Sequence, residues 1–434
     1  MGGTQLVKPG SVLGADAEDT AAFLVARNGQ QEAEILGLGQ QYRSLKERSG
    51  YTLGRVSAQN IRALYGKKLR LSASQVDKQA ECRLAYFLRY GLRVKERREA
   101  TVDPAEFGTY VHAVLEHTAR QVMELGGFHK VSLEKTMEIA MEYSEEYTAQ
   151  RFSDLDSQRL AYLFRRNIRE LAMVVEELWQ ELSHGEFAPV AFELAFGDDG
   201  QMPAIDIGGA NIPAQLRGFV DRVDAWSNGY TNYFRVVDYK TGRKDFDYCD
   251  VFNGIGLQML LYLFALREQG QALLGDNIAA AGVQYFPARS PVLTANARLD
   301  PEQAAQERAK GLKRKGLVLS DTDVLEAMEP EGSPKRLSCK ISKDGTLSGD
   351  IADRDQLELL RRYVFSVLRG LVNEIASGNV DPNPYCRGSS QDACTYCPYR
   401  AVCHSDTVEG RRNYKTMTAQ RFWEEIGREM AHHG

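Results

Sequence analysis

The chain has 434 residues, of which 43% are hydrophobic and 26% are charged; this composition excludes a disordered chain and predicts a globular protein with a substantial core. The formal net charge of -5 argues against a protein that binds nucleic acid mainly through overall positive charge. No apolar run is long enough to cross a bilayer and the N-terminus lacks a signal-peptide pattern, so we expect a cytoplasmic protein that is neither secreted nor inserted into a membrane.

The first part of the chain is predicted to be helical. Residues 1–70 are polar and helix-forming, and we expect them to be the tail of a preceding helicase-like domain or a helical extension. An amphipathic helix is expected to begin at Ser72 or Ser74 and to continue through Cys82 to about Leu88.

Further helices are followed by short β-type runs. One helix is expected to open near Gly108 and to close at Gly126, and more helix follows from Leu133 to about Gly185. The next predicted elements are strands within 189–196, 210–226 and 233–242, a helix over 256–270 and a strand over 282–288.

The last third of the chain is less regular. The stretch 294–350 is charged and is expected to be an insertion or a surface region, with the Arg and Lys residues of 308–315 as candidate phosphate contacts. A helix near 354–377 leads into a cysteine-rich segment, and residues 407–434 are expected to form a helical tail.

The clearest chemical signal is a pair of acidic strands in the centre of the chain. RGFVDRVDAW places Asp221 and Asp224 on one strand, and FRVVDYKTG places Asp238 and Lys240 two residues apart on the next. A hairpin would bring Asp221 beside Asp238, and converging carboxylates predict a divalent cation between them. Lys240 could then position a water molecule or stabilise charge on a phosphate. The alternative is an ordinary surface hairpin with a solvated or paired Asp238 and Lys240.

Two helices carry further candidate residues. Gln258 and Tyr262 lie four positions apart and therefore share one helix face, and His112 and Glu116 do the same in an earlier helix. The alternatives are a core tyrosine with a surface amide, and a histidine that has a purely structural role.

In this order, the motifs resemble those of the PD-(D/E)XK nuclease superfamily, in its RecB-like branch and there the AddB family. The resemblance extends from about residue 64 to 404 and implies an α/β fold over residues 71–406, with a restriction-endonuclease-like core of a central mixed β-sheet flanked by helices. The matching residues are Gly108 and His112; Gly218, Asp221, Arg222 and Asp224; Asp238 and Lys240; and Gln258 and Tyr262.

The resemblance also implies a role for each of these residues. It implies that Mg²⁺ or Mn²⁺ is bound by His112, Asp221, Asp238 and the backbone carbonyl of Tyr239. Lys240 would position the attacking water, whereas Gln258 and Tyr262 would support the site or contact the DNA backbone. Glu193 is a further candidate for the acidic set, although the sequence does not reveal the direction of its side chain.

The chain contains seven cysteines, and three of them have the spacing C-x2-C-x5-C at Cys394, Cys397 and Cys403. A large chain without a signal peptide favours metal binding over disulfides for such a cluster. The resemblance implies that Cys82 joins these three around a structural 4Fe-4S cluster, although the family's usual Cys-Pro is Cys82-Arg83 in this chain. A zinc site that uses Cys386 instead of Cys82 is the alternative, because four thiolates suit either group.

The resemblance implies a metal-dependent DNA nuclease with exonuclease-like activity in double-strand break repair and recombination. Its partners would be DNA, fed as a single strand by a helicase, and an AddA-type helicase-nuclease subunit. The chain has no G-x-x-x-x-G-K-[ST] phosphate loop, so we expect no ATP motor in it and take it for the C-terminal part of a longer subunit. The alternatives are a stand-alone RecB-like nuclease that trims DNA ends, and a non-catalytic DNA-binding module with a zinc site.

Overall fold

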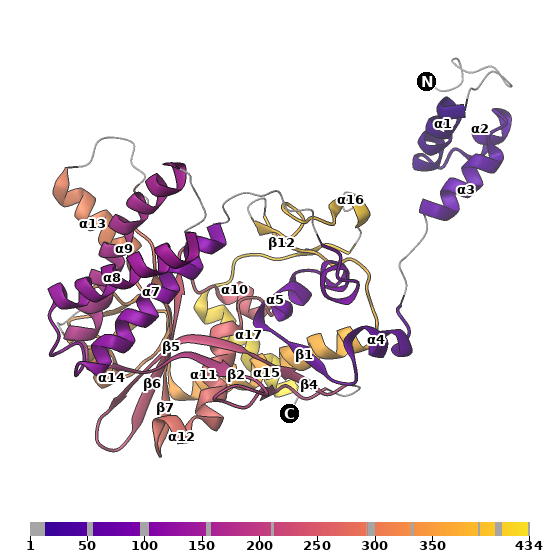
Figure 1. The fold of residues 1–434 in the computed structure, drawn as a ribbon. Coiled ribbons are helices and arrows are strands. Elements are labelled where there is room, and N and C mark those ends of the chain that lie inside the picture. The colour runs from indigo at the N-terminus through magenta and orange to yellow at the C-terminus, as the bar shows by residue number, and fades with distance from the viewer. Residues whose placement is uncertain are drawn as a thin grey trace. The chain divides into compact units, whose positions relative to one another are not determined.

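The structure is a computed structural model that describes residues 14–49, 55–95, 104–152, 158–209, 212–291, 293, 300–330, 334–388, 391–403 and 410–432. The chain divides into two compact units, residues 1–55 and 56–434 (Figure 1). The boundary therefore precedes the expected position at residue 70. No helix among the described residues is long and apolar enough to cross a membrane.

The first unit is a small group of helices with its own core. It contains α1 (Gly14–Ala26), α2 (Gln30–Ile35) and α3 (Gly39–Ser49). Leu24, Ala33 and Tyr42 are buried between these helices.

A six-stranded mixed sheet forms the centre of the second unit, with the strand order β11-β8-β7-β6-β5-β2. β6 and β7 are parallel, as are β8 and β11, whereas the other neighbouring strands are antiparallel. This arrangement confirms the predicted α/β fold with a central mixed sheet. The strands are β2 (Ala188–Phe196), β5 (Gly218–Ser227), β6 (Asn232–Lys240), β7 (Ile278–Pro287), β8 (Lys315–Leu319) and β11 (Ile351–Ala352).

Helices cover both faces of this sheet because its strands bury side chains in both directions. Val236 of β6 belongs to the main core with α11 (Gln258–Gln269) and α15 (Arg354–Ala376). Val237 and Tyr239 of the same strand belong to a second core with helices on the other face, which are gathered together in Figure 1. These helices are α7 (Pro104–Glu124), α8 (Leu133–Phe152) and α9 (Gln158–His184).

A smaller sheet lies at the start of β5. β4 (Ala214–Leu216) pairs with β1 (Leu69–Leu71) in parallel and with β3 (Ile205–Asp206) in the antiparallel direction. Only Arg217 separates β4 from β5, so a nearly continuous extended segment leads from the small sheet into the central one.

The predicted amphipathic helix around Cys82 is interrupted. α5 (Ala73–Glu81) begins at Ser72, whose side chain forms a capping box with Gln75, as the sequence suggested. Cys82 is extended, with φ -167° and ψ 121°, and α6 (Arg83–Tyr86) and the π-helical turn η1 (Phe87–Gly91) follow it. The prediction of one continuous helix is therefore wrong at Cys82, because an extended residue breaks the ladder of helical hydrogen bonds.

The stretch 294–350 also differs from the prediction of an irregular insertion. Its described part supplies β8, a strand of the central sheet that pairs with β7. The run 308–315 is not a uniform surface either, because the Arg314 side chain is buried. The other elements of this stretch are α13 (Pro301–Gly311), α14 (Thr322–Met328), β9 (Cys339–Ile341) and β10 (Leu347–Gly349).

The C-terminal segment returns to the main core. Phe422 and Ile426 of α17 (Ala419–His432) are completely buried there, so this helix is part of the folded unit. The remaining elements are α4 (Ala58–Tyr65), α10 (Tyr248–Phe252), α12 (Gln271–Leu274), β12 (Tyr385–Arg387), β13 (Gln391–Asp392), α16 (Arg400–Cys403) and β14 (Arg412–Asn413).

Candidate metal centre and cysteine cavity

Helix α7 and strands β5 and β6 bring His112, Asp221 and the backbone of Tyr239 together. Asp221 Oδ2 accepts a hydrogen bond of 2.7 Å from the Tyr239 N–H. His112 Nδ1 lies 3.4 Å from the same Oδ2 atom, and His112 Nε2 lies 2.8 Å from the Tyr239 carbonyl oxygen. Three of the four predicted metal-binding groups therefore meet where α7 crosses the ends of the two strands.

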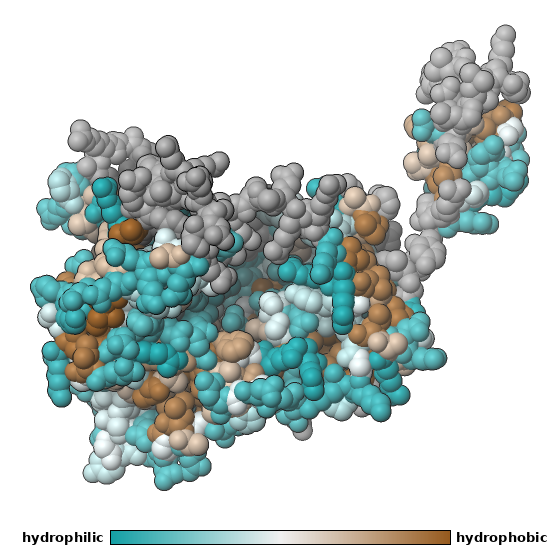
Figure 2. Space-filling model, viewed as in Figure 1, coloured by the Kyte–Doolittle hydropathy of each residue, from teal (hydrophilic) through white to brown (hydrophobic). Residues whose placement is uncertain are grey.

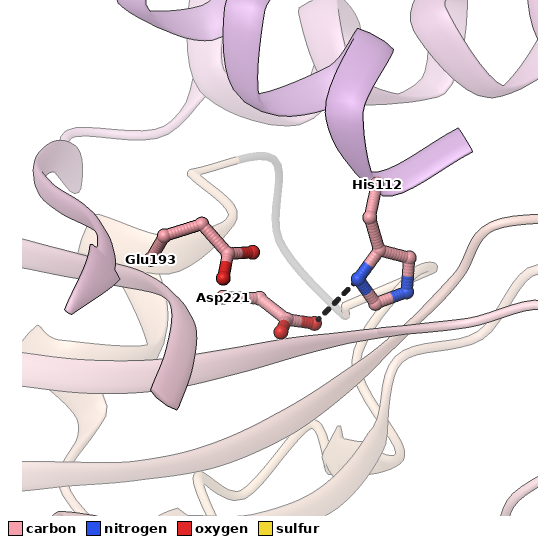
Figure 3. Close-up of side chains that lie close together, drawn as sticks. All are labelled: His112, Glu193 and Asp221. Carbon is pink, nitrogen blue, oxygen red and sulfur yellow. Dashed lines mark ion pairs between the residues drawn. The ribbon is translucent and has the colours of Figure 1, made fainter. Parts of the chain in front are cut away.

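Glu193 of β2 joins this group. His112, Glu193 and Asp221 each offer one ligand atom, and these atoms all lie within 4.8 Å of one another. Their side chains point toward one another from a helix and two strands (Figure 3). Glu193 has a positive φ of 46°, a strained conformation that is found preferentially at functional sites. The sequence contained the residue but no signal for this backbone conformation.

Asp238 and Lys240 lie beside the group and pair with each other. They alternate along β6, and the Lys240 ammonium contacts Asp238 Oδ2. Asp238 is only 4% exposed, and its Oδ2 atom has no regular hydrogen-bond donor among the described residues. A buried carboxylate with incomplete hydrogen bonding is a suitable ligand for a hard cation.

The electrostatics of the site reflect this crowding of carboxylates. Burial and the nearby Asp238 raise the pKa of Asp221 to about 6, against the opposing influence of His112, the Tyr239 N–H and Lys240. Burial and the nearby Asp221 raise the pKa of Glu193 to about 7. A divalent cation would stabilise the ionised forms of both groups, and the set of oxygen donors with one imidazole fits Mg²⁺ or Mn²⁺.

Asp224 does not belong to this site, although it is part of the same sequence motif. It is fully buried, and its two carboxylate oxygens each lie 2.8 Å from an arginine, Arg222 or Arg235. Glu181 of α9 completes the arrangement with distances of 2.7 Å to Arg222, 2.9 Å to Arg235 and 2.6 Å to Arg314. We call these five residues the buried charge cluster: Glu181, Arg222, Asp224, Arg235 and Arg314.

Gln258 and Tyr262 of α11 lie next to Asp238. Tyr262 is buried, and its ring stacks on Phe196 with 5.4 Å between the ring centroids. Burial raises the pKa of Tyr262 to about 12, a hydrogen bond with Gln258 lowers it, and Asp238 raises it again. A Cβ atom on Gly218 would lie 1.9 Å from the Tyr262 hydroxyl oxygen, so this motif glycine makes room for the tyrosine.

Cys82, Cys394, Cys397 and Cys403 all line a single cavity, which has about 360 Å³ of free space, part of it open to solvent. Burial raises the pKa of both Cys394 and Cys397, and the nearby Cys82 thiol raises it further. Apolar surface gathers over this region of α5, η1 and α16 (Figure 2). The structure thus brings the predicted fourth cysteine to the other three.

Hydrogen bonds between distant residues hold the two sides of this cavity together. The Arg83 N–H donates to Asn383 Oδ1 at 2.8 Å, and Arg412 Nε donates to the Asn383 carbonyl at the same distance. Arg412 also donates to the Ala80 carbonyl at the end of α5. A proline at position 83, as in the family's usual Cys-Pro, would lack the N–H that Asn383 accepts.

The other three cysteines do not line this cavity. Cys386 of β12 is buried next to Asp392, and Cys249 is buried with its thiol 3.2 Å from the Lys415 carbonyl oxygen. Cys339 is completely buried in the main core.

A comparison with family models identifies the chain. The model of the PD-(D/E)XK nuclease superfamily matches residues 70–404, most of the sequence. The chain belongs to this superfamily.

Several relatives of this PD-(D/E)XK protein are named as the AddB-type subunit of an ATP-dependent helicase/deoxyribonuclease. Those from Acetivibrio thermocellus, Clostridium tetani and Moorella thermoacetica are 34%, 33% and 34% identical to 91%, 81% and 85% of this chain. The matches cover 34%, 31% and 33% of the relatives' lengths, so the chain spans about a third of each relative. The predicted resemblance to the AddB family is confirmed.

Proposed function

We propose that this chain is a metal-dependent deoxyribonuclease that hydrolyses phosphodiester bonds within a helicase-nuclease of the AddAB type. The observation that carries the proposal is the convergence of His112, Glu193 and Asp221 within 4.8 Å, in a chain of a nuclease superfamily. The names of its relatives support DNA as the substrate and a helicase-nuclease subunit as the partner.

His112, Asp221, Asp238 and the Tyr239 carbonyl would hold Mg²⁺ or Mn²⁺, with Glu193 as an additional ligand. Such an ion lowers the pKa of a bound water and stabilises the negative charge that develops on a phosphate. Lys240 is about a third exposed, with 34% of its side chain accessible, so its ammonium can reach a solvent molecule as well as Asp238. We assign to it the orientation of the attacking water, and to Gln258 and Tyr262 the support of Asp238.

Replacement of Asp238 or Lys240 tests this proposal. Asp238→Ala and Lys240→Ala are each expected to abolish Mg²⁺-dependent degradation of DNA, because one removes a ligand and the other the group that orients the water. The fold should remain, as judged by circular dichroism and thermal unfolding. Asp344→Ala, which removes an exposed acid from a turn, is the matched control and should cleave at the normal rate. Undiminished cleavage by both site variants would refute the assignment.

We further propose that the four-cysteine cavity holds a structural 4Fe-4S cluster. Zinc binds thiolates at about 2.3 Å, which brings the sulfur atoms of a tetrahedral site to about 3.8 Å from one another. Within the described parts of the chain, only the three residues around Asp221 have ligand atoms that all lie within 4.8 Å, so the cysteine sulfurs are more widely spaced. This spacing, together with the position of Cys386 outside the cavity, supports the cluster over the zinc alternative.

A further inference from the structure

The extended segment that leads into the metal centre exposes an aromatic side chain. Phe219 of β5 is 60% exposed, although the residues on either side of it, Gly218 and Val220, face Tyr262 and the main core. In a strand, Phe219 and Asp221 both point away from the side taken by Val220 and are about 7 Å apart. Ala195 lies directly opposite Phe219 in β2 and is too small to cover its ring.

A cation without an acidic partner precedes this ring on the same side. Arg217 is exposed, and its backbone N–H is fixed by a 2.9 Å hydrogen bond to the Leu71 carbonyl. Its guanidinium forms no ion pair within the described part of the chain, whereas Arg70 on the neighbouring strand pairs with Asp198 at 3.2 Å. The alternation of buried and exposed positions continues through this segment, with Leu216 and Val220 in the core.

The segment therefore presents three different groups at intervals of two residues: a cation, an aromatic ring and a carboxylate of the metal centre. An exposed ring offers its face to a nucleobase, and base–aromatic stacking is a general means of binding single strands. An arginine can bind a phosphate with two hydrogen bonds. In a duplex, the faces of the bases are already stacked on one another, so only a single strand can present a base to such a ring.

We infer that Phe219 stacks on a nucleobase and Arg217 binds a phosphate of a single DNA strand that runs along β5 to the metal centre. The inference rests on the proposed nuclease function. Phe219 and Arg217 act as positioning residues, because they hold the strand while a neighbouring phosphate lies at Asp221.

The test compares DNA binding by the full chain and by variants of Phe219. The probe is a short fluorescein-labelled oligothymidylate in EDTA, so that binding is measured without cleavage. Phe219→Ala and Phe219→Leu are each expected to bind about tenfold more weakly, because both lose the stacking ring. Phe219→Trp should keep the affinity, and addition of DNA should quench its added indole fluorescence. Tyr230→Ala, which removes an 88% exposed ring from the turn at the other end of β5, should bind as the wild type does.

Salt dependence gives a separate measure for Arg217. Arg217→Ala is expected to lower the slope of log affinity against log salt by about 0.7, the value for one phosphate contact on a single strand. Normal affinity of both Phe219→Ala and Phe219→Leu, or an equal effect of Phe219→Ala on a duplex probe, would overturn the inference. If Phe219→Ala did not fold, the leucine variant would decide.

The same proteins distinguish this inference from the proposed function. If the wild type binds the oligothymidylate through Phe219 but does not cleave it in Mg²⁺ or Mn²⁺, the nuclease proposal fails and the strand contact stands. If the wild type cleaves it and Phe219→Ala binds and cleaves equally well, the nuclease proposal stands and the strand contact fails.

Discussion

A single missing methyl group at Gly218 determines how Tyr262 reaches the metal centre. The tyrosine hydroxyl occupies the space that a Cβ atom on residue 218 would take, at 1.9 Å. This contact explains why a glycine opens the acidic strand motif while a tyrosine closes the motif on α11. The two residues belong to one packing unit, although they are separated in the sequence.

Gly218→Ala is therefore expected to destabilise the protein by about 1–3 kcal/mol, the usual cost of overpacking a well-packed site. Tyr262→Phe removes the clashing oxygen, so the double variant should recover part of this loss. Denaturant unfolding measures both effects. The control is Gly370→Ala in α15, where a Cβ atom meets nothing within 4 Å and helix propensity predicts a gain of about 1 kcal/mol. An equally stable Gly218→Ala variant would contradict the packing argument.

The individual site residues could be predicted because local spacing rules determine their directions. Strand alternation placed Asp238 and Lys240 together, and the helical interval placed Gln258 beside Tyr262. Glu193 could only be named as a candidate, since its positive φ depends on packing between strands. Phe219 gave no signal, because an apolar residue in a strand is expected to be buried.

At the scale of elements, the buried charge cluster joins α9 to the back of the strand that carries the site. Glu181 of α9 contacts arginines from β5, β6 and the segment before β8. Arg222 also donates to the Tyr239 hydroxyl at 3.2 Å. The cluster thus fixes the strand whose Tyr239 backbone contacts His112 and Asp221.

Glu181→Gln is expected to destabilise the fold by about 3–5 kcal/mol, because it leaves buried arginines without their counter-charge. Burial alone would raise the pKa of Glu181, but Arg314, Arg235 and Arg222 outweigh it and hold the pKa well below its usual range. A lowered pKa contributes stability that is fully present above the ordinary value of 4.5 and is lost as the pH falls below it.

The free energy of unfolding of the wild type should therefore fall between about pH 5 and pH 3, and that of Glu181→Gln should fall less steeply. Urea unfolding over this range measures the difference. Glu176→Gln, an exposed position on the same helix, should retain both the stability and the pH dependence of the wild type. Identical pH profiles for the wild type and Glu181→Gln would exclude this role for the cluster.

The elements with a strong periodic pattern could be predicted, whereas those with only long-range support could not. α11 and β6 were expected because their apolar patterns are local. β8 was mistaken for part of an insertion, because its short apolar run follows a charged stretch and only pairing with β7 reveals it as a sheet strand. Arg314 was read as a surface charge, since its partner Glu181 lies 133 residues away.

At the scale of the whole molecule, the cysteine cavity connects the start of the nuclease unit with its end. Cys82 lies at the break between α5 and α6, and the other three cysteines lie beyond the central sheet in the sequence. A group bound to all four thiolates would tie both ends of this unit together, as a crosslink that closes a long loop does.

Cys82→Ser is expected to lose the bound iron and sulfide, together with the brown colour of the anaerobically purified protein, and to unfold at a lower temperature. Cys386→Ser, which changes a buried cysteine outside the cavity, should retain all three properties. Visible spectra, iron and sulfide analysis and thermal unfolding provide the measurements. A colourless wild-type protein with stoichiometric zinc, or loss of metal from Cys386→Ser alone, would overturn the cluster assignment.

The hydrogen bond between Arg83 and Asn383 has a consequence for the order of events in the cell. It joins residues 300 positions apart, so the turn that presents Cys82 is secured only when the ribosome has made almost the whole chain. The first cysteine waits through the synthesis of the central sheet before its three companions exist. A group held by all four is therefore inserted after translation, into a nuclease unit whose sheet can already have folded.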